Sequence, residues 1–401
     1  MKIVHLCQSY PPMISGASLH VQQLASGQAA NGHDVLVLSA SDRPHGYTTH
    51  DGRLQITRLP SHHNPYRIGQ RFLLWPQRAV WAELMRFQPD VIHLHEALGL
   101  GLIGLQAARR LQIPVMFTAH QLPWFATAYM PRVLGLPQLV ETITWQYARW
   151  FLRHCTTVIA PTRTIARIIE KRLRYPVQVV NYGINLHQFQ PTSTRPSEAN
   201  ELYRKYGLDP ELPVILHVGR LDVEKQVDVL VHAVAQVQQQ MPVQLLVIGD
   251  GCERQKLMQL GQGLGIAEQC HFPGYVLPDG DLPGLYRLAS VFATASQIET
   301  FGIVVLEAMA CGLPVIAANA TCMPELVHDH QNGLLVPPDD SFAMAQRLTW
   351  LLQNPDVAAR WREASGQMAQ HYGMSRMIQE VMAVYYTAVY RPHHHAAARF
   401  V

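Results

Sequence analysis

The sequence contains little charge and little cysteine. Its 401 residues are 15% charged and 48% hydrophobic, a composition that excludes disordered, collagen-like and coiled-coil chains. The six cysteines form no C-x-x-C pair, which favours buried thiols in a reducing, cytoplasmic compartment over a disulfide framework. The net charge of +3 gives no support to a nucleic-acid partner.

Long apolar runs and a secretory leader are also missing. Residues 97–105 form an apolar, glycine-rich stretch that is far shorter than the roughly 20 residues needed to span a bilayer. Residues 2–6 indicate a buried strand rather than a signal peptide. We therefore expect a cytoplasmic protein without a membrane span, which still permits a peripheral position at the inner face of the cell membrane.

Charge is distributed unevenly along the chain. Residues 1–200 contain 19 Lys and Arg against 9 Asp and Glu, a balance of +10, whereas residues 201–401 contain 13 against 20, a balance of −7. This asymmetry suggests that the two halves face different partners.

Short apolar runs alternate with helical patterns along the whole chain. The runs expected as strands are 3–7, 34–39, 91–94, 115–118, 157–160, 177–180, 214–218, 244–249, 271–273, 291–293 and 314–317. Continuous apolar strands are buried on both faces, which is typical of a parallel sheet between helices. The pattern predicts an α/β protein with two doubly wound domains. The polar segment 191–200 reads as a linker, so we expect one domain over 1–190, completed by a terminal helix at 376–391, and a second over 200–375.

In such domains ligands bind at the carboxyl ends of the strands, and polar motifs of the second half fall there. Arg220 follows Gly219 at a strand end, and Lys225 comes five residues later. An Arg and a Lys so placed can both reach a pyrophosphate. Asp250 lies in a small turn after the next strand. A solvated loop is the alternative interpretation of these segments.

The segment 299–307 carries two carboxylates and a glycine. Gly302 is expected to open a helix, so that residues 301–304 offer backbone N–H groups to an anion. Glu299 and Glu307 are too far apart in sequence for a close carboxylate pair. We therefore expect separate roles, one on a sugar and one on a ribose.

The first half offers two weaker candidates. Gly16 follows the first strand and precedes a helical pattern, where it would let the backbone approach a phosphate. An ordinary turn is the alternative, and the absence of a G-x-G-x-x-G motif disfavours a nicotinamide enzyme. His120 lies at a strand end and is either a substrate contact or a structural histidine.

Two residue pairs resemble metal ligands, and we expect no metal site from either. His93 and His95 are predicted to lie on opposite faces of one strand, and a zinc site would need further ligands. Asp279 and Asp281 form a D-x-D pair, but Asp281 precedes a helical pattern that has Pro283 in its first turn. This position predicts a helix N-cap.

Together these motifs resemble the retaining GT-B glycosyltransferases of family 4. The segment 299–307 and the small-residue helix that follows it are the most specific part, and 181–185 also fits the family. The resemblance covers nearly the whole chain. It implies two Rossmann-like domains that face each other across a cleft, with the terminal helix crossing back to the first domain.

The resemblance also implies the roles of individual residues. Arg220 and Lys225 would hold the pyrophosphate of a nucleotide-sugar, Glu299 the sugar hydroxyls and Glu307 the ribose. His120 would lie beside the reacting sugar. Gly16, Asp250, Val276, Phe301, Gly302 and Ile303 would complete the donor-binding set. The reaction would retain anomeric configuration, with no cofactor and no metal needed for donor binding. Ser15 departs from the family, which usually has a second glycine there.

A basic and aromatic segment bears on the acceptor. Its basic residues are Arg132, Arg149, Arg153, Arg163, Arg167, Lys171, Arg172 and Arg174, with Trp145, Trp150 and Phe151 among them and an aromatic run at 122–131 before them. Basic and aromatic residues on one amphipathic stretch indicate an interfacial element on an anionic membrane. A solvated helix with its aromatics in the core is the alternative.

The segments 95–102 and 224–228, with His120 and Tyr129, most resemble the diacylglycerol glucosyltransferase and phosphatidylinositol mannosyltransferase branches. This likeness favours a hexose, from UDP-glucose, and a membrane lipid acceptor such as diacylglycerol. A family 4 enzyme with a soluble sugar or polysaccharide acceptor and a GT-B sugar-nucleotide 2-epimerase remain alternatives. A non-catalytic membrane-binding relative is disfavoured by the intact Arg220, Lys225, Glu299 and Glu307.

Overall fold

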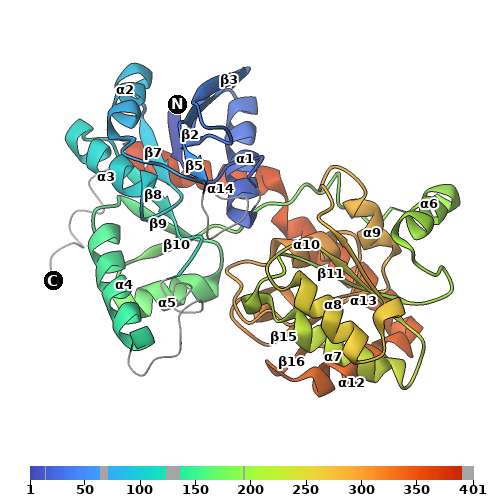
Figure 1. Cartoon of the computed structure of the whole chain (residues 1–401). Coiled ribbons are helices and arrows are strands. Elements are labelled where there is room, and N and C mark those ends of the chain that lie inside the picture. Colours follow the sequence, from blue (N-terminus) through green and yellow to red (C-terminus); the bar gives the residue numbers. More distant parts are fainter. Residues whose placement is uncertain (14, 64–70, 123–135, 193–194, 391–401) are drawn as a thin grey trace. The chain divides into compact units, whose positions relative to one another are not determined.

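The chain forms two compact units (Figure 1). The computed structural model describes residues 1–13, 15–63, 71–122, 136–192 and 195–390. The first unit comprises Met1–Gly183 and the chain from Met374 onward, and the second comprises Ile184–Gly373. The first unit thus ends before the expected boundary at residue 190, and the linker 191–200 lies wholly within the second.

The first unit is built on a sheet of eight strands in the order β10-β9-β8-β7-β1-β2-β4-β3. All neighbours are parallel except β3 and β4. The strands are β1 (Lys2–Leu6), β2 (Asp34–Ala40), β3 (Tyr47–Asp51), β4 (Leu54–Leu59), β7 (Val91–Leu94), β8 (Val115–Thr118), β9 (Thr157–Ala160) and β10 (Val177–Val179). A separate two-stranded ribbon joins β5 (His62–His63) and β6 (Arg71–Phe72).

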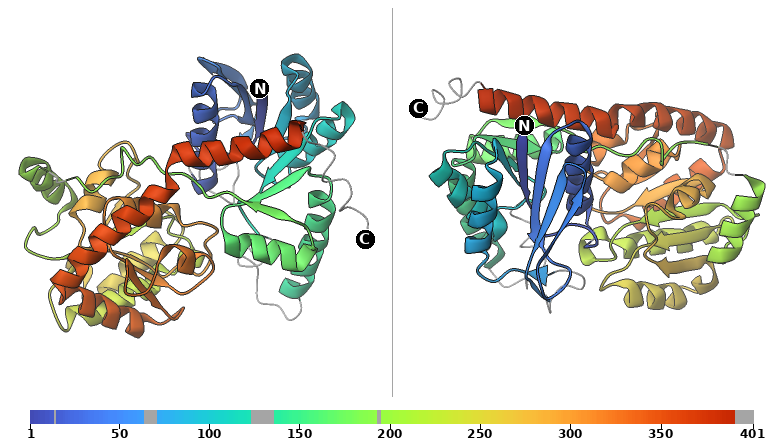
Figure 2. Two further views of the ribbon diagram at one scale, coloured as in Figure 1. Left: turned by 180° about the vertical axis from the view of Figure 1, so that it is seen from behind. Right: turned by 90° about the horizontal axis from the view of Figure 1, so that it is seen from above.

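Helices cover both faces of this sheet, because alternate residues of each strand enter two different apolar clusters. One cluster contains Val4 and Ile92 of the sheet and side chains of four helices. These helices are α2 (Gln77–Phe87), α3 (Leu100–Leu111), α4 (Leu136–Leu152) and α5 (Arg163–Leu173). The other face packs Ile3 and Val91 against α1 (Gly16–Ala30) and α14 (Met374–Tyr390). Figure 2 shows α14, in red, against this sheet.

The second unit is built on six parallel strands in the order β13-β12-β11-β14-β15-β16. They are β11 (Val214–Val218), β12 (Gln244–Ile248), β13 (Cys270–Gly274), β14 (Val291–Thr294), β15 (Val315–Ala318) and β16 (Gly333–Val336). The helices are α6 (Pro196–Tyr206), α7 (Val227–Gln238), α8 (Arg254–Gly263), α9 (Leu282–Leu288), α10 (Ile303–Ala310), α11 (Met323–Leu326), α12 (Ser341–Leu352) and α13 (Pro355–Ala369), with short 3₁₀ turns at Val223–Lys225, Ala267–Gln269 and Gln370–Tyr372.

Two α/β units with parallel cores confirm the predicted fold class, and α14 confirms that the chain returns to the first unit. The expected strands are all present near their predicted bounds. The strands β3, β4, β5, β6 and β16 were missed. β3 is an exposed edge strand of polar residues, so it has no apolar run to detect, and β16 is a four-residue strand that begins with glycine. In the described part of the chain, no helix combines the length and the apolar character needed to cross a membrane.

Gly27 sets the close approach of α1 and α14. A Cβ atom on Gly27 would lie 2.1 Å from Cδ1 of Ile378 on α14. We predict that Gly27→Ala lowers the free energy of unfolding in urea by about 1–3 kcal/mol through overpacking, despite the higher helix propensity of alanine.

Two variants control this prediction. In an Ile378→Val background, which lacks Cδ1, the loss caused by Gly27→Ala should be smaller. A Cβ on Gly263, the last residue of α8, would meet nothing within 4 Å, so Gly263→Ala should cause no loss. Equal losses for Gly27→Ala in both backgrounds would contradict the packing account.

Candidate functional site

In the second unit the loops after β11 and β12 lie backbone to backbone. Gly219 N–H donates to the carbonyl of Ile248 at 3.0 Å, and Leu221 N–H donates to that of Asp250 at 3.0 Å. Gly249 has φ +138°, and a Cβ on it would lie 1.8 Å from the Gly219 carbonyl oxygen. Only glycine fits such an approach. The two loops therefore bring Asp250 beside Arg220 at the carboxyl end of the sheet.

Two carboxylates orient Arg220. Its guanidinium bonds to Asp222 and, at 2.7 Å, to Oε1 of Glu224. Glu224 is buried, and its Oε2 has no hydrogen-bond partner among the described residues. About half of the Arg220 side chain is exposed (48%). The guanidinium is thus held at its inner side while part of its surface faces solvent.

Lys225 and Glu299 form an ion pair. The two side chains are only 17% and 15% exposed, and they come from loops 74 residues apart. Glu299 N–H donates to Oγ1 of Thr321 at 3.0 Å, which fixes the backbone that carries the carboxylate. The structure therefore brings together one residue predicted to bind the pyrophosphate and one predicted to bind the sugar.

The helix predicted to open at Gly302 is α10. Gly302 is its N-cap residue with φ +84°, a left-handed conformation that favours glycine. Phe301 is buried, with its ring edge-on to Tyr372 at a centroid distance of 6.1 Å. The Phe301 side chain therefore belongs to the core, and only its backbone is available to a ligand. Ile303, the first residue of α10, is partly exposed.

Glu307 lies on the buried side of α10. Tyr286 donates to its Oε2 at 2.9 Å. Burial raises the pKa of Glu307 to about 7, and the hydrogen bond from Tyr286 acts in the opposite direction. Burial raises the pKa of Tyr275, the residue before Val276, and the charge of Glu307 contributes to this rise. Val276 itself is partly exposed.

The D-x-D pair adopts a different arrangement from the predicted cap. Asp281 is the N-cap residue of α9, as expected, but its side chain makes no capping hydrogen bond. The carboxylate instead accepts from Lys205 and, at 2.8 Å, from Tyr206. An ammonium and a phenol on the same carboxylate outweigh the weaker attraction of a backbone N–H. Asp279 is exposed.

In the first unit Gly16 is the first residue of α1, and the departure at Ser15 has a structural reason. Ser15 is the N-cap of α1. Its Oγ accepts from Ser18 N–H at 3.0 Å, and Ser15 N–H donates to Oγ of Ser18 at 2.8 Å. This reciprocal capping box satisfies two backbone donors at the start of the helix. Gly16 is exposed beside it.

His120 is buried immediately after β8, and both of its ring nitrogens are engaged. Nε2 lies 2.9 Å from Nδ1 of His95, and Nδ1 is bonded to the hydroxyl of Tyr182. Burial lowers the pKa of His120 to about 3. The predicted substrate-contacting histidine is therefore a neutral member of an internal hydrogen-bond network.

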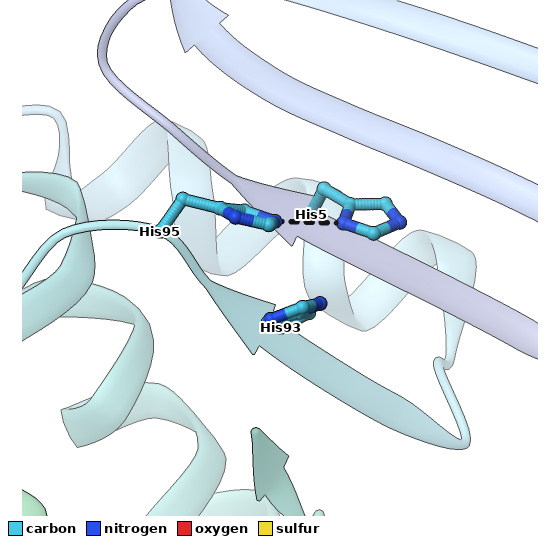
Figure 3. Close-up of side chains that lie close together, drawn as sticks. All are labelled: His5, His93 and His95. Carbon is cyan, nitrogen blue, oxygen red and sulfur yellow. Dashed lines mark hydrogen bonds between the residues drawn. The ribbon is translucent and has the colours of Figure 1, made fainter. Parts of the chain in front are cut away.

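The histidines at the ends of β1 and β7 form a cluster, which corrects the prediction for His93 and His95. Their ring centroids are 4.1 Å apart, because residues two apart on a strand share a face. His5 completes a group whose ligand-type nitrogen atoms lie within 4.8 Å of one another (Figure 3). Each nitrogen in the group already has a hydrogen-bond partner: His93 bonds to Tyr385 and Thr118, and His5 bonds to His95. The group satisfies its own polar atoms, as buried polar groups must.

Sequence reasoning missed His95 and Tyr182 as hydrogen-bond partners of His120, and His5 and Gln28 further along the same network. A signal was present, because β1, β7 and β8 each carry a histidine at or just beyond the carboxyl end. Adjacent parallel strands place such residues side by side at one edge of the sheet.

The basic and aromatic segment is divided between core and surface. Trp145 and Phe151 are buried, as the core alternative predicted, whereas Leu139, Ile143 and Trp150 are 56%, 54% and 44% exposed. Their spacing places these three on one face of α4, together with the partly exposed Leu136. Arg149, Arg153 and Arg167 are exposed on α4, on the turn after it and on α5. The aromatic run at 122–131 and Arg132 lie, apart from Leu122, outside the described residues.

Comparison with known proteins covers both units. Residues 14–188 match the family model of glycosyltransferase family 4, and residues 198–368 match that of the group 1 glycosyl transferases. The alpha-monoglucosyldiacylglycerol synthase of Acholeplasma laidlawii is 26% identical over 366 residues, with 89% of each chain covered. The GDP-mannose-dependent alpha-mannosyltransferase of Mycobacterium tuberculosis is 31% identical over 347 residues, with 84% of each chain covered.

A solved structure agrees at the level of the fold. The sucrose-phosphate synthase of Thermosynechococcus elongatus superposes with a TM-score of 0.80 at 21% identity, over 96% of this chain and 98% of that one. The two family models and the mannosyltransferase relative together settle the class of protein. The chain belongs to the group 1 glycosyl transferases of glycosyltransferase family 4 and is a glycosyltransferase with the GT-B fold.

Proposed function

We propose that this glycosyltransferase moves glucose from UDP-glucose to a membrane lipid such as diacylglycerol, with retention of anomeric configuration. The observation that carries the acceptor proposal is the exposed apolar face of α4 beside Arg149, Arg153 and Arg167. The similarity to a relative named for glucosyl transfer to diacylglycerol supports the same acceptor and sugar.

The donor side of the proposal rests on directed hydrogen-bond donors rather than on net charge. Arg220 and Lys225 are accompanied by three carboxylates, Asp222, Glu224 and Glu299. Because the carboxylates outnumber the two cations, net charge does not attract an anion to these residues. An anion would be held by hydrogen bonds from the Arg220 guanidinium and the Lys225 ammonium. As the bond to the sugar breaks, negative charge develops on the nucleoside diphosphate, and a guanidinium, an ammonium and the start of α10 would stabilise it.

The Lys225–Glu299 ion pair gives each partner a role in the donor complex. In the free protein each residue neutralises the other. When the donor binds, its phosphates would replace the carboxylate at Lys225, and its sugar hydroxyls would replace the ammonium at Glu299. A carboxylate so released accepts hydrogen bonds from hydroxyl groups. Glu307, which the neighbouring Tyr286 holds in place, would meet the ribose.

The surface of α4 fits a membrane interface. Leu139, Ile143 and Trp150 are exposed on one face of α4, which they share with the exposed Gln146, and exposed apolar side chains grouped in this way mark interaction sites. Arginines beside an anionic lipid leaflet contribute roughly 1 kcal/mol each. Docking through α4 would bring the first unit, which is proposed to bind the acceptor, to the lipid.

A second candidate uses a different donor. The mannosyltransferase relative is more similar in identity than the diacylglycerol relative, and its name specifies GDP-mannose. Transfer of mannose from GDP-mannose is therefore the competing assignment.

A panel of donors and acceptors tests the proposal. UDP-glucose, UDP-galactose and GDP-mannose are each incubated with diacylglycerol vesicles, with soluble sugars and with no acceptor, and products are identified by mass spectrometry. Glucosyldiacylglycerol from UDP-glucose supports the proposal. Products formed only with soluble sugars, only with GDP-mannose, or by epimerisation of the donor alone would contradict it.

We predict that Arg220→Ala and Lys225→Ala each lower kcat by about a hundredfold or more, the cost of one lost contact to developing charge. Both residues lie on the loop after β11, so the fold should survive, as circular dichroism would show. Lys256→Ala is the matched control, because Lys256 is an exposed lysine on α8 paired only to Glu253 in the described structure. Near-normal rates for Arg220→Ala or Lys225→Ala would remove the pyrophosphate assignment.

Activity should persist in a metal chelator, because the proposed donor contacts need no divalent ion. The Asp281 carboxylate is already occupied by Lys205 and Tyr206. The measurement is the rate of UDP release with excess chelator, then with Mg²⁺ or Mn²⁺ restored. Loss of activity that either ion rescues would reinstate Asp279 and Asp281 as ligands.

Binding to the membrane should depend on charge and on α4. The triple variant Arg149→Gln, Arg153→Gln and Arg167→Gln should co-sediment less with anionic vesicles, and raised salt should weaken binding of the parent as the Debye length falls from about 10 Å at 0.1 M to about 3 Å at 1 M. Arg172 is left unchanged because it pairs with Glu141 and lies over the Trp145 ring.

Arginines on other elements provide the matched control for this experiment. Arg86, Arg109 and Arg110 are exposed on α2 and α3, and their replacement by Gln removes the same charge. Donor hydrolysis without acceptor should change little in either triple variant. Equal loss of binding in both triple variants would show that overall charge, and not α4, controls binding. Unchanged binding of the first variant would show that the basic segment is a solvated surface without a role in membrane binding.

A further inference from the structure

A continuous chain of hydrogen bonds runs through the interior of the first unit to His120. Gln28 Oε1 lies 2.7 Å from Nε2 of His5, His5 Nδ1 lies 2.9 Å from Nε2 of His95, and His95 Nδ1 lies 2.9 Å from Nε2 of His120. The chain ends at the bond between His120 Nδ1 and the Tyr182 hydroxyl. All five side chains are buried.

The amide of Gln28 sets the direction of this chain. Its Nε2 donates to Sδ of Met382 at 3.7 Å. The N–H₂ end of the amide therefore faces α14, and the carbonyl end faces His5.

A carbonyl accepts and cannot donate, so His5 must carry its proton on Nε2. Burial holds the pKa of His5 at about 4 and that of His95 well below its usual value, so each ring is neutral and has one N–H and one lone pair. His5 Nδ1 must then accept, and the donor facing it is Nε2–H of His95. By the same step His95 Nδ1 accepts from Nε2–H of His120. The remaining lone pair, on His120 Nδ1, accepts from the Tyr182 hydroxyl.

We propose that Gln28, His5 and His95 are positioning residues that fix His120 with a lone pair on Nδ1, so that this atom receives a hydrogen bond from a substrate hydroxyl in place of Tyr182. The proposal rests on the proposed function and on the place beside the reacting sugar that the family resemblance implies for His120. A histidine fixed in this way binds an alcohol and offers no proton to a phosphate. We call the hydrogen-bonded chain from Gln28 through His5 and His95 to His120 the relay. It assigns His120 to the recognition of a hydroxyl group, and the anionic leaving group is left to the second unit.

The first test reads the tautomers directly and needs no substrate. In the full-length protein labelled with ¹⁵N-histidine, two-bond ¹H–¹⁵N correlations distinguish a protonated from an unprotonated ring nitrogen. The expected result is that His5, His95 and His120 are neutral and protonated on Nε2. Protonation of His120 on Nδ1, or an imidazolium at any of the three, would overturn the proposal whatever reaction the enzyme catalyses.

Variants at the far end of the relay then test its effect on catalysis. Gln28→Leu removes the terminal acceptor and leaves every histidine in place. It should give His120 a mixture of tautomers and lower kcat about tenfold, the rate equivalent of one lost hydrogen bond, with KM for the nucleotide-sugar unchanged. Gln28→Glu keeps an acceptor for His5 and should restore both the tautomer and the rate. Gln28→Leu with parental tautomers or parental kcat would overturn the proposal.

His93 provides the matched control. It is equally buried and its ring centroid lies 4.1 Å from that of His95, but it bonds to Tyr385 and Thr118 and is outside the relay. His93→Asn should leave the tautomers and kcat as in the parent. A tenfold loss of kcat in this variant as well would show that general damage to the cluster, not the relay, is responsible.

The hydroxyl that meets His120 can belong to the donor sugar or to the acceptor alcohol, and one comparison separates them. If it belongs to the sugar, Gln28→Leu should slow hydrolysis of the nucleotide-sugar without acceptor as much as it slows transfer. If it belongs to the acceptor, only transfer should slow. Failure of the parent to glucosylate diacylglycerol would contradict the proposed function and leave the tautomer result standing.

Discussion

Burial of both faces of each parallel sheet is the constraint on which the rest of the structure depends. Apolar side chains on both sides of β1 and β7 leave little room for polar side chains except toward the carboxyl ends of the strands. Parallel strands all end at the same edge. In the first unit that edge gathers the histidine relay, and in the second it gathers Arg220, Lys225 and Glu299.

The two edges satisfy their polar groups by opposite means. Burial lowers the pKa of each histidine in the relay of the first unit, and each of their ring nitrogens has a hydrogen-bond partner, so the relay can be buried without a counter-ion. The second unit holds full charges, which are partly exposed and paired to one another. A neutral site suits an alcohol, and a site of exchangeable ion pairs suits a nucleoside diphosphate. The division of labour proposed for the two units follows from this difference in solvation.

Sequence alone predicts much of this arrangement, because apolar runs and strand-end motifs are local signals. Such signals predict the apolar strands of both sheets other than β4 and β16, the glycine at the start of α10 and the positions of Arg220 and Glu299. The partners of these residues do not. The ion pair of Lys225 with Glu299 joins loops 74 residues apart, and Asp281 meets Lys205 and Tyr206 on α6 rather than capping its own helix.

The first unit shows the same limit. The prediction that His93 and His95 lie on opposite faces was wrong because it misapplied the two-residue period of a strand. The order β8-β7-β1 that aligns their histidines is a property of the whole sheet, since β7 and β8 follow β1 by many residues in sequence. The relay forms only in that strand order. The histidines near the strand ends are visible in the sequence, but the strand order has no local signal there.

We propose that donor binding exchanges the Lys225–Glu299 ion pair for contacts to phosphate and sugar. A crystal structure with UDP-glucose bound tests it most directly. We expect Lys225 Nζ at hydrogen-bond distance, about 3 Å, from a phosphate oxygen, with Glu299 bonded to the sugar hydroxyls and the ion pair broken. A bound nucleotide-sugar with that ion pair intact, and with its phosphates away from Arg220, would contradict it.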